Sequence, residues 1–336
     1  MYNFKNDYNT IGHPKLLQVL VDFSNEENEG YGLDDISLTL EKKVQKMVKE
    51  NVSVYLLSGG TLTNLIALSK MLKPYEAVIA AESGHINVHE TGSIEATGHK
   101  IIPVKSIDGK IESSMIEKVM MEHHDFHMVK PKVVYISNST EVGTIYTKDE
   151  LLRLSKVCKK YDLYLYLDGA RLAQALTAND NDLSLKDITE LTDAYYLGGT
   201  KNGLPYGEML IIKNKEINES FRYHLKSKGG VFSKTFVLAY LFNKYLEDDF
   251  YLSLAKHANN QAEYLRFELQ KENITEVFPN HTNQIFIKVK KEVAQKLAKN
   301  FLFEIWQEDE DYQIIRLVTS YHTQNFECDA LIKALA

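Results

Sequence analysis

The chain has 336 residues, which is enough for about two domains of ordinary size. Its composition, with 44% hydrophobic and 25% charged residues but only 6 Pro and 17 Gly, is typical of a folded globular protein and excludes a disordered or fibrous one. The net charge of −7, without massed basic residues, argues against nucleic acid as a partner, so we expect a small-molecule partner.

The cysteines and the N-terminus bear on the compartment. Cys158 and Cys328 lie far apart in the sequence, which indicates neither a disulfide framework nor a cysteine metal site. The first eight residues lack the apolar core of a signal peptide, and no apolar run approaches the length of a membrane span. We therefore expect a cytoplasmic protein without membrane contact.

Short runs rich in β-branched and aromatic residues alternate with segments of helical periodicity from about residue 50 to 215. This alternation predicts an α/β fold, with a mostly parallel sheet covered by helices on both faces. Seven strands are predicted, over Val52–Leu57, Ala77–Ala81, Lys100–Val104, Lys132–Ser137, Leu163–Leu167, Asp193–Leu197 and Glu208–Lys213. Apolar residues at helical spacing, as over 62–72 and 151–157, predict the crossover helices.

The pattern changes after Gly230. It predicts one long helix over Phe236–Leu269, followed by strands over Gln284–Lys288 and Ile314–Thr319. We therefore expect a large α/β domain over 1–230 and a small α+β domain over 231–336.

Polar and glycine-rich motifs follow the predicted strands, where parallel sheets bind their ligands. Ser58-Gly59-Gly60-Thr61 leads into a helix, and free N–H groups at a helix start suit a phosphate, although an ordinary capped turn would also explain it. The next strand is followed by His85, which could stack on a flat ligand or carry a proton, or be merely structural.

An acid and a lysine end the last two parallel strands. Asp168 needs a cationic partner if it is buried, either Arg171 or a ligand cation such as a protonated pyridine nitrogen. Lys201, after Gly198-Gly199-Thr200, suits an anion or a Schiff base. Pyridoxal phosphate needs a phosphate loop, a carboxylate for its ring nitrogen, a flat partner for its ring and a lysine for its aldehyde. The four motifs together therefore indicate this cofactor.

The chain resembles the threonine aldolase and β-eliminating lyase group of fold-type-I pyridoxal phosphate enzymes, over nearly its whole length. The matching stretches are Asn6-Asp7, Tyr31-Gly32, Ser58 to Asn64, Gly84-His85, His89 to Gly92, Asp168 to Arg171, Gly199 to Lys201 and Arg316 to Ser320. The resemblance implies a seven-stranded large domain, a small domain, and an N-terminal arm of about 20 residues near the active site.

The resemblance also implies roles for individual residues. Lys201 would bind the cofactor aldehyde, Asp168 its ring nitrogen, and His85 would stack on its ring. The remaining cofactor contacts would come from Ser58, Gly59, Gly60, Thr61, Arg171 and Thr200. The substrate would be bound by Asn6, Tyr31, His89, Glu90, Arg171 and Arg316, with the two arginines on its α-carboxylate. No metal is implied.

The implied reaction is cleavage of L-threonine or L-allo-threonine to glycine and acetaldehyde, with His85, or a water that it orders, as the candidate base. A β-eliminating amino-acid lyase using the same cofactor is one alternative. Another is a different class of protein, a non-catalytic amino-acid or phosphate binding protein or a nicotinamide oxidoreductase, which would not need the amine of Lys201.

Some positions depart from the family pattern. The run Asn138-Ser139-Thr140-Glu141 lacks the histidine that such aldolases carry near the substrate β-carbon. The arginine with which a neighbouring subunit usually reaches the phosphate has no clear match, and Lys228 is the candidate to replace it, as a point charge without the bidentate fork. The resemblance implies a homodimer or homotetramer with active sites at the dimer interface. Outside these motifs, we expect the polar run Glu122–His127 to be a solvated segment and Trp306 to lie in a core or interface.

Overall fold

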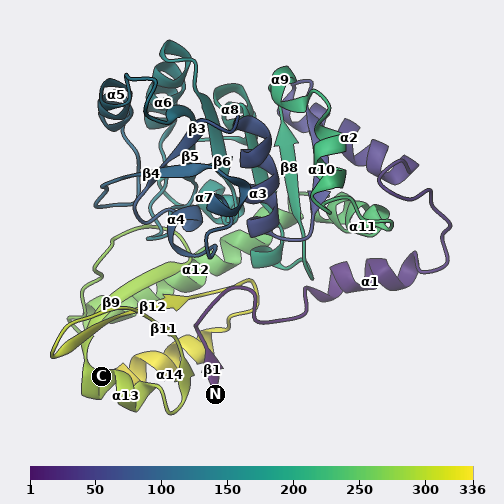
Figure 1. The fold of residues 1–336 in the computed structure, drawn as a ribbon. Helices are drawn as coiled ribbons and strands as arrows, with labels where there is room; N and C mark the ends of the chain where they lie inside the picture. The colour runs from purple at the N-terminus through teal and green to yellow at the C-terminus, as the bar shows by residue number, and fades with distance from the viewer. Residues whose placement is uncertain (336) are drawn as a thin grey trace.

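The computed structural model describes residues 1–335 and consists of a large α/β part and a smaller C-terminal part (Figure 1). The centre of the large part is a seven-stranded sheet in the order β2-β8-β7-β6-β5-β3-β4, in which only β8 runs antiparallel to its neighbours. Its strands are β2 (Ser53–Leu57), β3 (Glu76–Ala81), β4 (Lys100–Val104), β5 (Lys130–Ser137), β6 (Tyr164–Asp168), β7 (Ala194–Gly198) and β8 (Glu208–Ile212). All seven predicted strands and the predicted fold class are confirmed.

Helices cover both faces of this sheet because both faces of its strands are apolar. One face packs against α2 (Asp35–Val48), α5 (Ser113–Glu122), α6 (Lys148–Lys160), α7 (Leu172–Leu176), α8 (Leu185–Leu191) and α11 (Thr235–Tyr245). The other packs against α3 (Gly60–Met71), α4 (His85–Val88), α9 (Lys215–Asn218) and α10 (Phe221–Ser227). The remaining elements of this part are α1 (Pro14–Asp22) and the short 3₁₀ helices η1 (Glu95–Thr97) and η2 (Thr200–Asn202).

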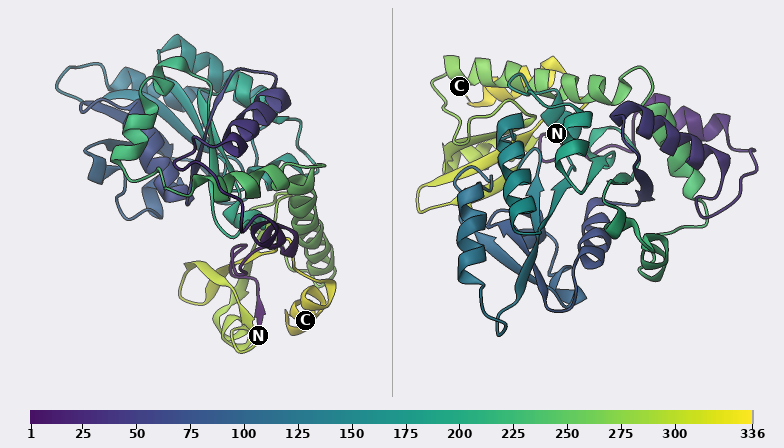
Figure 2. Two further views of the ribbon diagram at one scale, coloured as in Figure 1. Left: turned by 90° about the vertical axis from the view of Figure 1, so that its right-hand side faces the viewer. Right: turned by 90° about the horizontal axis from the view of Figure 1, so that it is seen from above.

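The C-terminal part has its own sheet, in the order β11-β12-β9. Its elements are α12 (Phe250–Lys271), β9 (Gln284–Lys290), α13 (Lys291–Leu297), β10 (Phe301–Leu302), β11 (Glu304–Glu308), β12 (Tyr312–Val318) and α14 (Asn325–Leu335). The apolar residues of these elements and Phe4 form a separate core. Figures 1 and 2 show α12 running from the large part to this sheet.

The single long helix predicted over Phe236–Leu269 is wrong, because two helices, α11 and α12, cover this range. The chain turns between them, where Asp248 and Asp249 adopt positive φ angles of 49° and 55°. This turn lets α11 pack on α1 and α2, beside the large sheet, while α12 leads toward the C-terminal part. The predicted division into domains at residue 230 stays a prediction. The last residue of the predicted second domain, Ala336, lies outside the described residues.

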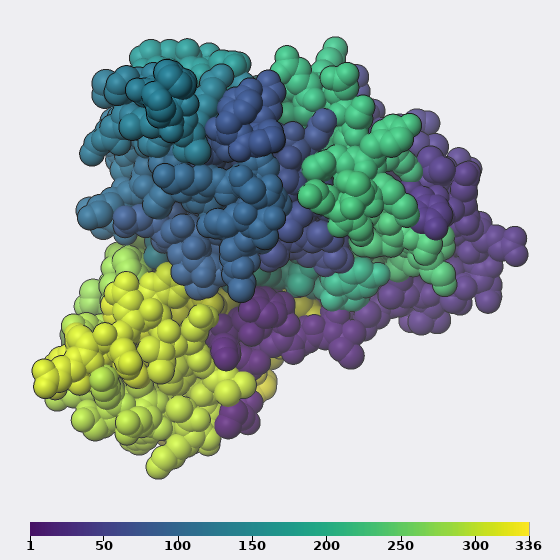
Figure 3. All heavy atoms as spheres, viewed as in Figure 1, coloured from purple at the N-terminus to yellow at the C-terminus, as the bar shows by residue number. Residues whose placement is uncertain are grey.

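The N-terminal segment joins the two parts. Strand β1 (Tyr2–Asn3) pairs in parallel with β10, and Phe4 is buried in the C-terminal core. Figure 3 shows this purple segment packed against the yellow C-terminal part. Within residues 1–335, no helix is long and apolar enough to cross a membrane.

Candidate active site

A cavity of about 270 Å³ opens at the edge of the large sheet where the parallel strands end. Its walls come from the loops after β2, β3, β5, β6 and β7, from the start of β8 and from the N-terminal segment. It brings together every residue that the sequence predicted to contact the cofactor, namely Ser58, Gly59, Gly60, Thr61, His85, Asp168, Arg171, Thr200 and Lys201. Their individual roles stay predictions.

Asp168 ends β6 and is 4% exposed. Its Oδ2 accepts hydrogen bonds from Tyr135 and Asn64, at 2.7 and 2.9 Å. Its Oδ1 accepts from Tyr196. Burial raises the pKa of Asp168, but the charge of His85 and these hydrogen bonds lower it more, so the net pKa lies below its usual value. The cavity therefore presents a charged carboxylate that could hold a cationic ring nitrogen.

Lys201 lies in the loop between β7 and β8. Its burial, together with the Arg171 guanidinium, lowers the pKa of the amine to about 8. The adjacent Glu208 accepts a 2.9 Å hydrogen bond from the backbone N–H of Gly199, and burial raises the pKa of Glu208 to about 7. A substantial fraction of Lys201 is therefore neutral near physiological pH, as a nucleophilic amine requires.

The N-terminus of α3 faces the same cavity through Gly59, Gly60 and Thr61. The first N–H groups of a helix have no partner within the helix, so they are available to an anion. A Cβ on Gly60 would come within 3.0 Å of the Tyr196 hydroxyl, which is bonded to Asp168. The lack of a side chain at Gly60 thus allows the start of α3 to lie close to Tyr196 and Asp168.

His85 is oriented by a carboxylate behind it. Its Nδ1 lies 2.8 Å from Oε1 of Glu90, whose side chain is fully buried. Asn64 donates to that same oxygen at 2.8 Å and Ser93 to the other, also at 2.8 Å. Glu90, predicted to contact the substrate, is thus placed where it positions His85.

The two arginines predicted to bind the substrate carboxylate both have acidic partners. Arg171 forms a two-pronged ion pair with the buried Asp7, with Nε to Oδ2 at 2.7 Å and Nη2 to Oδ1 at 3.1 Å. Burial raises the pKa of Asp7, but the charge and hydrogen bonds of Arg171 favour the ionised carboxylate more strongly. The net pKa of Asp7 therefore lies below its usual value. Arg171 still lines the cavity, with Tyr8 beside the same opening.

Arg316 lies on β12 and pairs with Glu304 of β11. Its guanidinium carbon lies 5.3 Å from the centre of the Trp306 ring, which is also 6.2 Å from the ring centre of His89. Within residues 1–335, Nε of Arg316 is buried without a hydrogen-bond partner. His89, Trp306 and Arg316 therefore form one cluster. Trp306 also packs against the buried Phe286, and its place in a core or interface stays a prediction.

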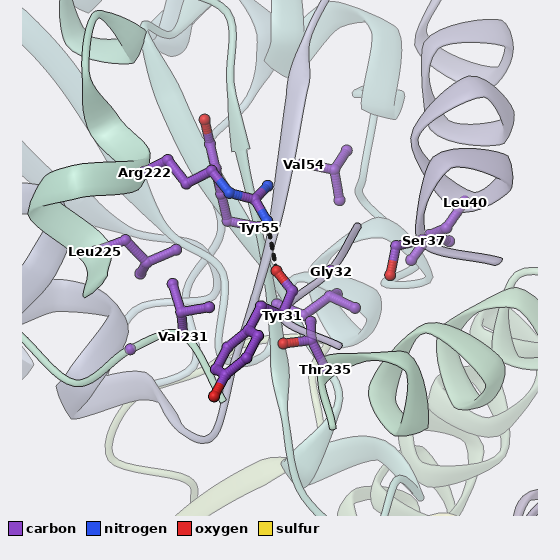
Figure 4. A pocket seen from close by; sticks show the side chains of 12 residues that line it. Tyr31, Gly32, Ser37, Leu40, Val54, Tyr55, Arg222, Leu225, Val231 and Thr235 are labelled. Atoms are coloured by element: carbon purple, nitrogen blue, oxygen red, sulfur yellow. Dashed lines mark hydrogen bonds between the residues drawn. The ribbon is translucent and has the colours of Figure 1, made fainter. Parts of the chain in front are cut away.

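Tyr31 lies apart from the cavity. It lines a separate hollow beside β2, together with Arg222, Val231 and Thr235 (Figure 4). Its backbone oxygen accepts a hydrogen bond from Arg222. Asn6 caps a local turn by accepting from the N–H of Tyr8 at 3.1 Å. Neither side chain is among those lining the cavity.

Two tyrosines at the site were not predicted. Tyr135 and Tyr196 surround Asp168 together with Asn64, which belongs to the predicted stretch Ser58 to Asn64. Ser139 and Glu141, from the polar run predicted after the fourth strand, line the wall after β5. Tyrosines inside buried strands look like core residues in a sequence, so only the register of the sheet reveals them. The run Glu122–His127 starts at the last residue of α5, away from the cavity, and Nδ1 of His127 lies 2.8 Å from Asp125.

Comparisons with known proteins show which family and fold this chain shares. The family model described as beta-eliminating lyase matches residues 7–292. A low specificity L-threonine aldolase of Pseudomonas aeruginosa is 30% identical over 84% of this chain and 83% of its own, and one from Pseudomonas sp. is 32% identical over 80% and 78%. The solved structure of a Leishmania major threonine aldolase has a TM-score of 0.98 and 40% identity, covering 100% of this chain and 98% of that chain. A Thermus thermophilus aspartate aminotransferase shares the fold, with a TM-score of 0.75 and 12% identity over 100% and 91% of the two chains.

Proposed function

Because this chain belongs to the beta-eliminating lyase family, we propose that it is a pyridoxal phosphate-dependent aldolase that cleaves L-threonine or L-allo-threonine to glycine and acetaldehyde. It is a carbon–carbon lyase that acts on a small amino acid. The observation that carries this proposal is the meeting of Lys201, Asp168 and the N-terminus of α3 around one cavity.

The residues of the cavity fit the cofactor. The N-terminus of α3 and the Thr200 hydroxyl suit its phosphate, and Asp168 suits its ring nitrogen. The hydroxyl of Ser139 is buried in the cavity wall without a partner within residues 1–335, so it can form a hydrogen bond with a bound cofactor. When bound, pyridoxal phosphate withdraws electrons from Cα of an amino acid and so weakens the bonds to that carbon.

The side chains of this protein orient the substrate. Arg171 and Arg316 are the groups that would hold the α-carboxylate, with Asn6 near them, and a planar guanidinium fixes a carboxylate in direction as well as position. This orientation decides which bond to Cα stands where it can break. Asp168 is charged at neutral pH, because its pKa lies below its usual value, and it can therefore pair with a cationic ring nitrogen.

One experiment tests this function. Visible absorption of the purified protein is recorded before and after borohydride, and acetaldehyde is then assayed after L-allo-threonine is added. We expect a yellow protein that bleaches on reduction and releases acetaldehyde, a Lys201→Ala variant that does neither, and an unaffected control variant at the exposed Lys299, Lys299→Ala. Colour without acetaldehyde would transfer the function to a β-eliminating lyase, and a protein that never binds the cofactor would overturn both.

We further propose a homodimer or homotetramer in which Tyr31 acts in the partner's active site. Exposed apolar side chains gather around Tyr31, which is 47% exposed, including Leu33 at 51% and Tyr223 at 84%. Such a patch favours an interface. The nearby Lys228 is exposed and would supply the positive charge for the partner's phosphate.

Subunit mixing tests this arrangement. Inactive Tyr31→Ala and Lys201→Ala subunits are mixed, dissociated and reassembled. If Tyr31 acts across the interface, mixed dimers regain one working site, whereas recovery of none would contradict the proposal. We also propose a reducing, cytoplasmic setting, supported by two buried cysteines that are not paired.

A further inference from the structure

Three carboxyl groups line the cavity, those of Asp168, Glu208 and Glu141, and the steps described so far have no use for Glu141. It follows β5, which lies between β3 and β6 in the sheet. His85 follows β3 and Asp168 ends β6, so Glu141 lies between them on the cavity wall.

One oxygen of Glu141 is fixed and the other is free. Its Oε1 accepts a hydrogen bond from the Ser137 hydroxyl at 2.8 Å and from the backbone N–H of His85 at 2.9 Å. Within residues 1–335, no hydrogen bond reaches Oε2. The side chain is 9% exposed, yet it lines the cavity, so the free oxygen is available to a bound molecule.

The loop that carries Glu141 is held rigidly. The carbonyl oxygen of Thr140 accepts a hydrogen bond from Gln284 at 3.2 Å, and that of Gly143 accepts one from Thr282 at 2.9 Å. Both donors belong to the C-terminal part, so this part of the protein holds the loop in place. A base on a fixed loop needs little rearrangement before it reacts.

The other polar groups of the cavity are less suited to accept a proton from a substrate hydroxyl. Asp168 already accepts from several donors, and Tyr196 is itself a donor to it. Glu208 accepts hydrogen bonds from both the backbone N–H of Gly199 and the Thr200 hydroxyl, and it lies beside Lys201. His85 is tied through Nδ1 to Glu90, which leaves it well placed as the flat partner of a ring.

We infer that Glu141 is the catalytic base that removes the β-hydroxyl proton of the substrate, an inference that rests on the proposed aldolase function. The proton moves to Oε2 of Glu141. The electrons of the O–H bond form the second carbon–oxygen bond of the aldehyde, and the electrons of the Cα–Cβ bond stay with Cα. Cα then takes up a proton from the cavity while Glu141 releases its own, so the products are glycine and the aldehyde without net gain of protons.

The electrostatic setting supports this role. Burial and the charge of Asp168 raise the pKa of Glu141 above its usual value, although the hydrogen bond from Ser137 opposes this. A carboxylate with a raised pKa is a stronger base than one in water. Glu141 is also close enough to Arg171 to stabilise its charge, which places the base near the expected site of the α-carboxylate.

The test compares two reactions of the holoenzyme. Cleavage of L-allo-threonine needs a base for the β-hydroxyl, whereas exchange of the α-proton of glycine in D₂O needs the cofactor and Lys201 but no β-hydroxyl. In Glu141→Gln we expect cleavage to fall about 10²- to 10⁴-fold, the usual contribution of a general base, while glycine exchange stays within about tenfold of wild type. The acidic limb of the pH profile of kcat/KM should also disappear.

Glu82→Gln is the matched control, because Glu82 is exposed at the end of β3 and the substitution removes the same charge. It should leave both reactions unchanged. If Glu141→Gln cleaves at the wild-type rate, or loses glycine exchange in parallel with cleavage, the inference is overturned. If the wild-type protein exchanges glycine but cleaves no β-hydroxy amino acid, the proposed function itself fails.

Discussion

Nδ1 of His85 lies 2.8 Å from Oε1 of Glu90, a carboxylate whose side chain has no contact with solvent. Asn64 connects this pair to Asp168, because its amide nitrogen donates to Glu90 at 2.8 Å and to Asp168 at 2.9 Å. The residues expected on the face of the cofactor ring and at its nitrogen thus belong to one buried network. In such networks each bond depends on the others, so a change at Glu90 should reach the active site.

We predict that Glu90→Gln lowers kcat about 10- to 100-fold, because it removes a charged hydrogen bond of about 1.5–3 kcal/mol to the imidazole. Cofactor binding, measured by visible absorption, should persist. Glu95→Gln is the control, since Glu95 is exposed a few residues away. A Glu90→Gln enzyme with wild-type kcat would show that the pair does not position His85.

The amine of Lys201 should set the pH dependence of cofactor binding. Its pKa is lowered from 10.5 to about 8, and only the neutral amine attacks an aldehyde. The rate at which the apoenzyme binds pyridoxal phosphate should therefore rise through pH 7 and level off above about pH 8. Stopped-flow absorption measures this rate. A rate that keeps rising to pH 10 would mean that burial does not perturb the amine.

The ion pair of Asp7 and Arg171 should matter for stability. In Asp7→Asn the buried guanidinium loses its countercharge, which typically costs about 3–5 kcal/mol in the free energy of unfolding. Urea denaturation of the apoprotein measures the loss. The double variant Asp7→Asn/Arg171→Met should recover part of it, because no unpaired charge remains; equal stability of the single and double variants would argue against this explanation.

The same pair predicts a pH effect. The pKa of Asp7 is lowered in the folded protein, so its stabilisation is complete above the unfolded pKa of 3.8 and is lost as the pH falls through the lower folded value. Stability measured between pH 6 and pH 2 should decline less steeply in the double variant Asp7→Asn/Arg171→Met than in wild type. Parallel curves would rule out Asp7 as a contributor.

Glu304 should compete with the substrate for Arg316. The carboxylate of Glu304 forms an ion pair with the Arg316 guanidinium, which is expected to bind the substrate. The Glu304 side chain is 34% exposed. Glu304→Gln should lower KM by up to about fivefold, in line with ~1 kcal/mol for a partly exposed pair, with little change in kcat. Steady-state kinetics with L-allo-threonine measure both. Arg316→Lys should raise KM, since lysine lacks the planar fork. An unchanged KM in Glu304→Gln would show that the ion pair of Glu304 and Arg316 breaks at no cost when the substrate binds.

The sequence alone determined the strands, the large sheet and the family. Alternation of apolar runs with helical segments specifies strands from local information, and all seven predicted strands of the large sheet are found. The residues after those strands, such as Asp168 and Lys201, could be predicted to meet because parallel strands bring their carboxyl ends to one edge. The long helix failed for a local reason, since neither Asp248 nor Asp249 signals a break as glycine or proline would.

Only the tertiary structure decided which side chains partner one another. Glu90 stands behind His85, Asp7 holds Arg171, Glu304 covers Arg316, and Tyr31 lies in a separate hollow. Each of these placements depends on contacts between residues from different elements, and sequence spacing carries no information about their direction. Hydrogen bonds and ion pairs act over a few ångströms, so the protonation and orientation of the site follow from packing that only the folded chain specifies.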